Sequence, residues 1–261
     1  MDFTVSKYRD LCAAIAESPY LSCTVDQAIQ DTAIPFAGHR IVLRHDVDRF
    51  PRLALPLAEI ESRHGLIASY YFRIPSSFNT DVIAAIRDMG HEIGLHYESL
   101  DKAKGDMALA EQSLALDLAE MRKVCGVRTV SMHGNPLSKH DNRDIWKNIS
   151  FDDYDLNGEV YLSMDFTKFL YYSDTGRTWE DGKFNIKDVI PQGMERVDRK
   201  PMLKTTDDLV ALIQSDDRNI YLLIHPERWT STLAGWAASL GKDVVVNAAK
   251  VAYKFTLGNR S

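Results

Sequence analysis

The segment Arg40–Asp48 constrains the fold most, because in it an apolar run ends abruptly in one histidine and two aspartates. Burying an unpaired charge is costly, so a strand that ends in His45, Asp46 and Asp48 must place these groups against partners or a ligand. Side chains two residues apart on a strand face the same side, so Asp46 and Asp48 are expected to lie together. The pattern indicates an active site at a strand end.

From residue 40 onward, apolar runs alternate with helical patterns, which is typical of βα units and a mostly parallel sheet. The expected strands cover residues 41–45, 67–73, 92–96, 127–133 and 219–225. The expected helices, which end at glycines or begin at capping residues, cover residues 53–63, 79–89, 106–124 and 207–214. Residues 134–200 have no regular pattern and are interpreted as long loops and short strands.

The start of the chain has a different pattern. Residues 5–30 indicate an amphipathic helix and its turn. We therefore expect residues 1–39 to form a helical lead-in packed on a barrel domain that spans residues 40–261. A chain of 261 residues that is 45% hydrophobic can bury one large core of this kind, as α/β barrels of roughly 250 residues do.

Composition excludes several classes of partner. The net charge is −6 without a run of Lys or Arg, which argues against nucleic acid or anionic lipid. The three cysteines have no CxxC spacing, so neither a disulfide framework nor a zinc–thiolate site is indicated. No apolar window approaches the ~18 residues of a membrane span, and the N-terminus lacks a signal-peptide pattern. We expect a cytoplasmic protein.

Three further histidines, His96, His133 and His225, also stand where predicted strands end. Ligands bind at the carboxyl ends of the strands in α/β barrels, so these side chains are expected to converge with the two aspartates. Imidazole and carboxylate together suit a divalent metal such as zinc, which in catalytic sites has three protein ligands. A second carboxylate can then take a proton from water, and a histidine opposite can protonate the leaving group.

Four segments carry a family resemblance: Leu43–Asp48, Ser69–Phe72, Gly90–His96 and Leu223–Pro226. In this order they resemble the polysaccharide deacetylase family, carbohydrate esterase family four, over roughly residues 40–230. The resemblance implies a distorted (β/α) barrel of about seven strands. It also implies metal-dependent hydrolysis of N-acetyl or O-acetyl groups on carbohydrate.

The resemblance also implies roles for individual residues. Asp46 matches the catalytic base of the family, His96 the first histidine of its metal pair, and His225 the general acid. The adjacent aspartates of the family are here separated by Val47, which leaves the metal-binding carboxylate to Asp48. The roles of the two aspartates remain exchangeable at this point.

The sequence departs from the family at the second metal histidine. Leu100 stands at this position, four residues after His96. The segment Ser131–Pro136 also replaces the family segment whose arginine orients the base. Our hypothesis is that His133 supplies the missing ligand from a neighbouring strand end, with Glu98 as an alternative. Substrate contacts are expected from residues beside these strand ends, namely Tyr97, Asn135 and Trp229.

These observations predict a metal-dependent hydrolase, with zinc as the expected ion, that removes an acetyl group from a sugar or glycan precursor. Two alternatives remain. A catalytically inactive carbohydrate-binding protein could keep the fold without the second metal histidine. A metal-dependent amidohydrolase could use the same barrel on a small non-sugar amide, since the loops of such folds set the substrate.

Overall fold

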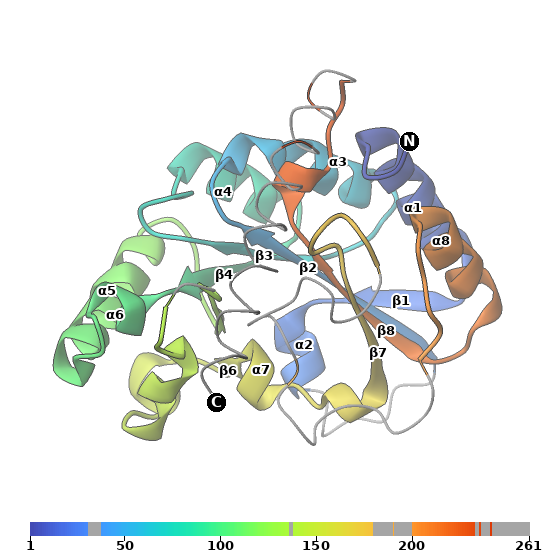
Figure 1. Ribbon diagram of the computed structural model, residues 1–261. Helices are drawn as coiled ribbons and strands as arrows, with labels where there is room; N and C mark the ends of the chain where they lie inside the picture. Colours follow the sequence, from blue (N-terminus) through green and yellow to red (C-terminus); the bar gives the residue numbers. More distant parts are fainter. Residues whose placement is uncertain are drawn as a thin grey trace.

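The computed structural model describes residues 1–30, 38–135, 138–179, 190, 200–232, 235 and 241. A curled sheet of parallel strands lies at its centre, with helices on the outside (Figure 1). The strands are β1 (Tyr20–Cys23), β2 (His39–Val47), β3 (Ser69–Phe72), β4 (Glu92–Tyr97), β5 (Thr129–Met132), β6 (Gly158–Glu159), β7 (Phe169–Ser173) and β8 (Asn219–Ile224).

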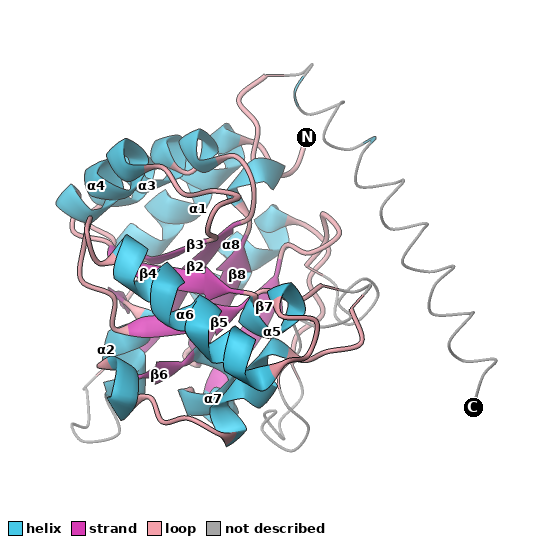
Figure 2. Ribbon diagram, turned by 90° about the vertical axis from the view of Figure 1, so that its left-hand side faces the viewer, coloured by secondary structure: helices cyan, strands magenta, loops and turns pink. Residues whose placement is uncertain are grey.

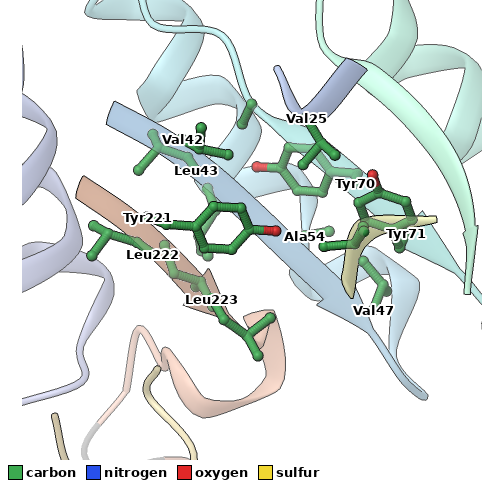
Figure 3. Packing of buried hydrophobic residues seen from close by; sticks show 14 of the residues in the cluster. Val25, Val42, Leu43, Val47, Ala54, Tyr70, Tyr71, Tyr221, Leu222 and Leu223 are labelled. Carbon is green, nitrogen blue, oxygen red and sulfur yellow. The ribbon is translucent and has the colours of Figure 1, made fainter. Parts of the chain in front are cut away.

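Seven of these strands form one path, in the order β6-β5-β4-β3-β2-β8-β7, and every pairing is parallel. This confirms the predicted distorted (β/α) barrel of about seven strands. Nearly all strand residues are buried, as expected for a parallel sheet covered on both faces. Val42 of β2 pairs with Tyr221 of β8, and Leu43 pairs with Leu222 (Figure 3).

Helices surround the sheet, and their arrangement is seen from a second direction in Figure 2. The α-helices are α1 (Val5–Glu17), α2 (Val25–Gln30), α3 (Leu55–Arg63), α4 (Thr80–Asp88), α5 (Ser99–Lys102), α6 (Met107–Met121), α7 (Val160–Ser163) and α8 (Thr206–Ser215). The 3-10 turns are η1 (Pro51–Leu53), η2 (Asn142–Lys147), η3 (Asp152–Tyr154), η4 (Phe166–Lys168) and η5 (Pro226–Arg228). In the described part of the chain, no helix is both long enough and apolar enough to span a membrane.

The helix ends follow the capping signals of the sequence. The Thr205 hydroxyl accepts from the backbone N–H of Asp208, whose carboxylate accepts in return from the Thr205 N–H, so α8 begins with a capping box. Gly65 and Gly90 follow α3 and α4 with φ of +70° and +94°, a left-handed conformation that favours glycine. The predicted strands and long helices are all present, with bounds shifted by a few residues.

The positions of three short strands were not predicted. The region of β1 was expected to be a helix and its turn, but β1 pairs with residues 39–42 of β2. β3 pairs with residues 44–47 of β2, and β8 overlaps both stretches, so β1 and β3 occupy one edge of β2 in succession. The other two, β6 and β7, lie in the region interpreted as loops and short strands. With two residues, β6 is too short to show a period in the sequence. β1 and β7 are at least as long as the predicted strands β3 and β5, but β1 lies beside the helical pattern of residues 5–30 and β7 lies within the irregular region 134–200.

The N-terminal segment docks onto residues that are distant in sequence. The backbone N–H of Thr206 donates to Asp2 Oδ2 at 2.9 Å, and that of Val5 donates to the Thr230 carbonyl at 3.1 Å. The Phe3 ring packs edge-on against Trp229, with 5.3 Å between ring centroids. As a result, α1 lies beside α8 (Figure 1).

Candidate active site

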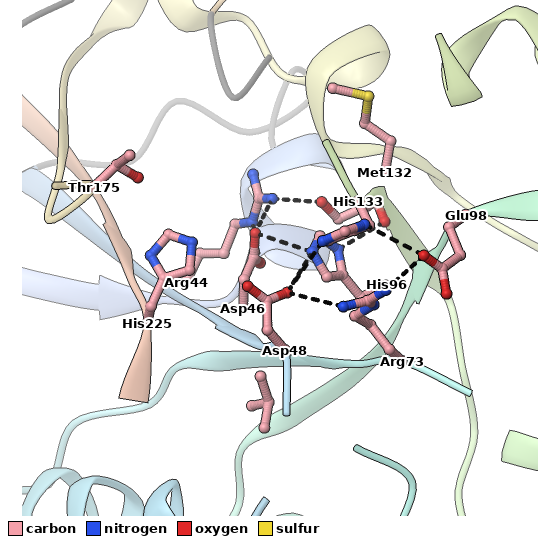
Figure 4. A network of polar contacts seen from close by, with 12 residues as sticks. Arg44, Asp46, Asp48, Arg73, His96, Glu98, Met132, His133, Thr175 and His225 are labelled. Atoms are coloured by element: carbon pink, nitrogen blue, oxygen red, sulfur yellow. Dashed lines mark hydrogen bonds and ion pairs between the residues drawn. The ribbon is translucent and has the colours of Figure 1, made fainter. Parts of the chain in front are cut away.

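The carboxyl ends of six neighbouring strands bring charged and polar side chains together at one end of the sheet (Figure 4). Each of these residues lies on the last residues of a strand or within two residues after it. We call the set the strand-end cluster: Arg44, Asp46, Asp48, Arg73, His96, Glu98, His133, Asp174 and His225. The two aspartates and three histidines that were predicted to converge all belong to this cluster.

Asp46 is buried and held by an arginine of its own strand. Arg44 Nε and Nη2 donate to the two carboxylate oxygens of Asp46 at 2.8 and 2.6 Å. Arg44 and Asp46 are two positions apart on β2, so both side chains face the interior of the barrel. The Arg44 guanidinium also donates to Ser131 Oγ and lies 4.9 Å from the centre of the Tyr161 ring. This bidentate pairing fixes the plane of the Asp46 carboxylate.

Asp48 lies between two imidazoles. Its Oδ1 is 3.6 Å from His96 Nε2 and 3.7 Å from His133 Nε2, and it accepts no hydrogen bond in the described structure. Burial alone would raise the pKa of Asp48, but the nearby His133, His96 and His225 outweigh it and lower the pKa. A buried oxygen of this kind without a hydrogen-bond donor calls for an explanation.

The His96 ring is oriented with Nε2 toward the two aspartates. Its Nδ1 lies 3.0 Å from the Ser131 carbonyl, to which it can only donate, so the neutral ring leaves Nε2 as an acceptor. Burial lowers the pKa of His96 well below its usual range, which favours this neutral form. His96 Nε2 therefore points its lone pair at carboxylate oxygens of Asp46 and Asp48, each 3.6 Å away. Acceptors that face one another in this way suit a cation between them.

The donors fit a divalent metal by their chemistry and in part by their geometry. Ligand atoms around one tetrahedral zinc ion, each about 2.0–2.1 Å from it, lie about 3.4 Å apart. The distances from Asp48 Oδ1 to the two Nε2 atoms, 3.6 and 3.7 Å, are slightly wider than this. As it stands, no group of three His, Cys, Asp or Glu side chains among the described residues is closed tightly enough to hold an ion. The bond from His96 Nδ1 to a backbone carbonyl is typical of a metal-ligating histidine.

Glu98 lies on the opposite side of His133 from Asp48. Its Oε2 is 3.4 Å from His133 Nδ1 and accepts from Arg73 Nη2 at 2.5 Å. Burial would raise the pKa of Glu98, but the contacts to His133 and Arg73 lower it to about 2. Glu98 is therefore placed to orient His133, while Asp48 faces the other ring nitrogen.

His225 lies across the cluster, on the opposite side of Arg44 and Asp46 from His96 and His133 (Figure 4). Its Nδ1 is 2.7 Å from Asp174 Oδ1, and its backbone N–H donates to Asp174 Oδ2 at 2.9 Å. Since Nδ1 is engaged, Nε2 remains for other contacts.

The charge of Asp174 sets the protonation of this histidine. Burial would raise the pKa of Asp174, but Arg228 and His225 lower it to about 2. Burial and Arg228 act to lower the pKa of His225, and Asp174 outweighs them, so the pKa of His225 is raised. An imidazole with a raised pKa is suited to donate a proton near neutral pH.

The structure does not bring every predicted residue into the cluster. The Tyr97 side chain is fully buried, and its hydroxyl accepts from Trp146 Nε1 at 2.9 Å. Trp229 is also buried and donates from Nε1 to Asp174 Oδ2 at 3.0 Å, so it supports Asp174. Asn135 is half-buried in the loop after β5. Leu100 is buried in α5, and its position supplies no metal ligand.

Three members of the strand-end cluster were missed by the sequence analysis. Arg44 could have been found, because the period of a strand places it on the same face as Asp46. Arg73 directly follows β3, and Asp174 directly follows β7, so both obey the strand-end rule that identified the histidines. The strand before Asp174 was not predicted, so the rule could not be applied there.

Comparisons with known proteins complete this description. No family model and no curated protein matches the chain. It is similar to the solved structure of wild-type BA3943, described as a CE4 family pseudoenzyme from Bacillus anthracis, with 13% identity and a TM-score of 0.40. Two mutants of that protein, one described as having restored enzymatic activity, give 12% identity and TM-scores of 0.39 and 0.37. The matches cover 82% of this chain but only 62–64% of the BA3943 chains.

Proposed function

We propose that this protein is a metal-dependent hydrolase that removes an acetyl group from a sugar or glycan precursor. The observation that supports it is the opposed arrangement of the strand-end cluster: a carboxylate with two imidazoles on one side and an aspartate-supported imidazole on the other (Figure 4). Hydrolysis of an acetyl group needs a proton acceptor for water and a proton donor for the leaving atom, and this arrangement offers both.

Asp46 takes the role of base. Its carboxylate, held in one plane by Arg44, accepts a proton from the attacking water as the water oxygen bonds to the acetyl carbon. His225 takes the role of acid. Its Nε2 donates a proton to the sugar nitrogen or oxygen as the bond from that atom to the acetyl carbon breaks, while Asp174 stabilises the charged ring. Acetate and the deacetylated sugar are the products.

Asp48, His96 and His133 are the residues that would hold the metal, with zinc as the ion we propose. When bound, such an ion supplies Lewis acidity for the acetyl carbonyl and lowers the pKa of water. Glu98, beside His133 Nδ1, and the Ser131 carbonyl, bonded to His96 Nδ1, would orient the two imidazoles toward it.

The test is release of acetate from a panel of N-acetylated and O-acetylated saccharides by zinc-loaded protein. We expect release that is lost on chelation and falls about 10²–10⁴-fold in Asp46→Asn, as for loss of a catalytic base. Asp81→Asn is the matched control, because Asp81 is exposed on α4. No release by protein that demonstrably contains the metal would overturn the proposed substrate.

A second candidate function is carbohydrate binding without catalysis. The specific observations in its favour are Leu100 at the position of a family ligand and the lack of a closed three-donor group among the described side chains. This candidate predicts that acetylated saccharides bind equally well with and without chelator in a calorimetric titration, and that no zinc is retained after dialysis.

A further inference from the structure

Asn142 is a buried amide outside the strand-end cluster that joins two of the loops carrying it. It begins η2 and is 2% exposed. Its Oδ1 accepts from the backbone N–H groups of Leu100 and Asp101, both at 3.0 Å. Its Nδ2 donates to the His133 carbonyl at 3.0 Å and to Asp101 Oδ2 at 3.1 Å. An amide group has two donor hydrogens and two acceptor positions, so this side chain uses its full bonding capacity.

The first loop joined by Asn142 is the one that follows β4. Leu100 and Asp101 lie in the first turn of α5, where backbone N–H groups have no partner within the helix. Asn142 supplies that partner from a different part of the chain. Glu98 directly precedes α5, so the contact also fixes the direction in which Glu98 leaves the strand.

The second loop is the one that begins at His133, directly after β5. The His133 backbone N–H donates to the Tyr97 carbonyl at 2.7 Å, and its own carbonyl accepts from Asn142. The His133 ring itself is held more loosely, since its Nδ1 is 3.4 Å from Glu98 Oε2 and makes no closer hydrogen bond. The position of the ring therefore depends on how the backbone is held.

We propose that Asn142 is a positioning residue that sets the His133 imidazole opposite Asp48 and His96. The inference rests on the proposed function, in which these three residues hold the metal. Because Leu100 takes the place of a second histidine after β4, the two imidazoles come from different strand ends, His96 from β4 and His133 from β5. The two loops must then be kept at a fixed distance, and Asn142 bonds directly to both.

The variant that isolates this role is the exchange Asp101→Asn with Asn142→Asp. The exchanged pair can still bond to each other, and the new carboxylate still accepts from the first turn of α5. What is lost is the donor to the His133 carbonyl. The single variant Asn142→Asp is measured alongside, so the result does not depend on one protein folding. Asn148→Asp is the matched control, because Asn148 is exposed at the end of η2.

The measurement is a Co²⁺ titration of each protein at one pH, followed by its visible absorption spectrum, with thermal unfolding recorded in parallel. We expect the exchange variant to bind Co²⁺ about 10–100-fold more weakly than wild type, the usual cost of losing support behind a metal ligand. Its spectrum should change because the coordination changes, while its unfolding midpoint should fall by only a few degrees, as for the loss of one buried hydrogen bond. Asn148→Asp should match wild type in all three readouts.

Three outcomes would overturn the inference. A wild-type Kd and spectrum in the exchange variant would show that the bond to His133 does not position the ring. An unchanged spectrum in His133→Ala would show that the ring is not a ligand, although the metal itself binds. A wild-type protein that binds no Co²⁺ would overturn the metal site of the proposed function and this inference with it.

Discussion

Two carboxylates on opposite sides of β2, Glu61 of α3 and Asp48, differ in how many hydrogen bonds they accept. On the face toward α3, Glu61 lies 2.6 Å from His45 Nε2, accepts from the Tyr70 hydroxyl at 2.6 Å, and also accepts from the Tyr8 hydroxyl. On the face toward the barrel interior, Asp48 lies just beyond the strand, and its Oδ1 accepts no hydrogen bond in the described structure. Both oxygens of Glu61 thus accept hydrogen bonds within the fold, whereas Asp48 Oδ1 accepts none.

The face of β2 toward α3 supports the strand, and the other face carries the strand-end cluster. We call Tyr8, His45, Glu61 and Tyr70 the Glu61 cluster; all four side chains are completely buried. His45 stacks on Tyr70 with 4.1 Å between ring centroids, so these contacts hold β2 in place on the face toward α3. His45 lies between Arg44 and Asp46 in sequence, so the contacts also hold the backbone of the proposed base. A rigid support of this kind lets a neighbouring site keep bonding capacity for a ligand.

The largest expected effect comes from breaking the Glu61 cluster. We expect Glu61→Leu to lower the free energy of unfolding by about 3–5 kcal/mol, because it leaves His45 buried without its partner. Chemical denaturation provides the measurement, with Glu59→Leu on the exposed side of the same helix as the control. A loss below 1 kcal/mol would mean that the cluster does not clamp the strand.

Removal of a single hydroxyl from each face of the neighbouring strand β3 is expected to have unequal effects on stability. Tyr70→Phe removes a donor to the carboxylate of Glu61 and should cost about 1.5–3 kcal/mol, the usual range for a bond to a charged group. Tyr71→Phe on the other face removes a bond to Thr129 Oγ1, a neutral partner at 2.7 Å, and should cost about 0.5–1.5 kcal/mol. Equal losses in urea unfolding would contradict the difference between the faces.

A pH effect is expected from Asp174. Its pKa in the folded protein is about 2, below its ordinary value of 3.8, so its charge stabilises the fold above the ordinary value. This contribution is lost as the pH falls through about 2. We expect wild type to exceed Asp174→Asn in unfolding free energy by about 2 kcal/mol near pH 6. The gap should shrink steadily from pH 5 to pH 2, and a gap independent of pH would rule out this origin.

The smallest stability effect is expected at Asp48. Because its Oδ1 accepts no hydrogen bond, Asp48→Asn should change the unfolding free energy of metal-free protein by less than about 1 kcal/mol at a pH that keeps His133, His96 and His225 neutral. The same substitution should abolish metal retention, measured as zinc per chain by elemental analysis. If the variant retained one zinc per chain, Asp48 would not be a metal ligand.

The strand-end residues were predictable because their signal is local. A polar side chain directly after an apolar run is visible in the sequence, and this rule predicted Asp46, Asp48, His96, His133 and His225. The parallel sheet then brings the five together without further information, since every strand in the path ends on the same side.

The contacts between distant segments were not predictable in this way. Glu61 is one acid on the apolar side of a helix, and nothing near it in the sequence indicates that His45 is its partner. Tyr97 was expected at the substrate because it follows His96, yet adjacent strand residues point to opposite faces. Trp229 was expected to contact the substrate, but its indole bonds to Asp174, which follows β7 in a region whose sequence shows no regular pattern.

The docking of the N-terminal segment onto residues 206–230 affects the order in which the chain can fold during synthesis. At about 5–20 residues per second, a ribosome needs roughly 10–40 s to extend the chain by the 200 residues that separate these partners. During this time Phe3 has no Trp229 to pack against, and α1 has no α8 beside it. The side of α1 that packs against α8 is thus among the last surfaces to be covered, whereas Tyr8 on the same helix can pack against Glu61 of α3 much earlier.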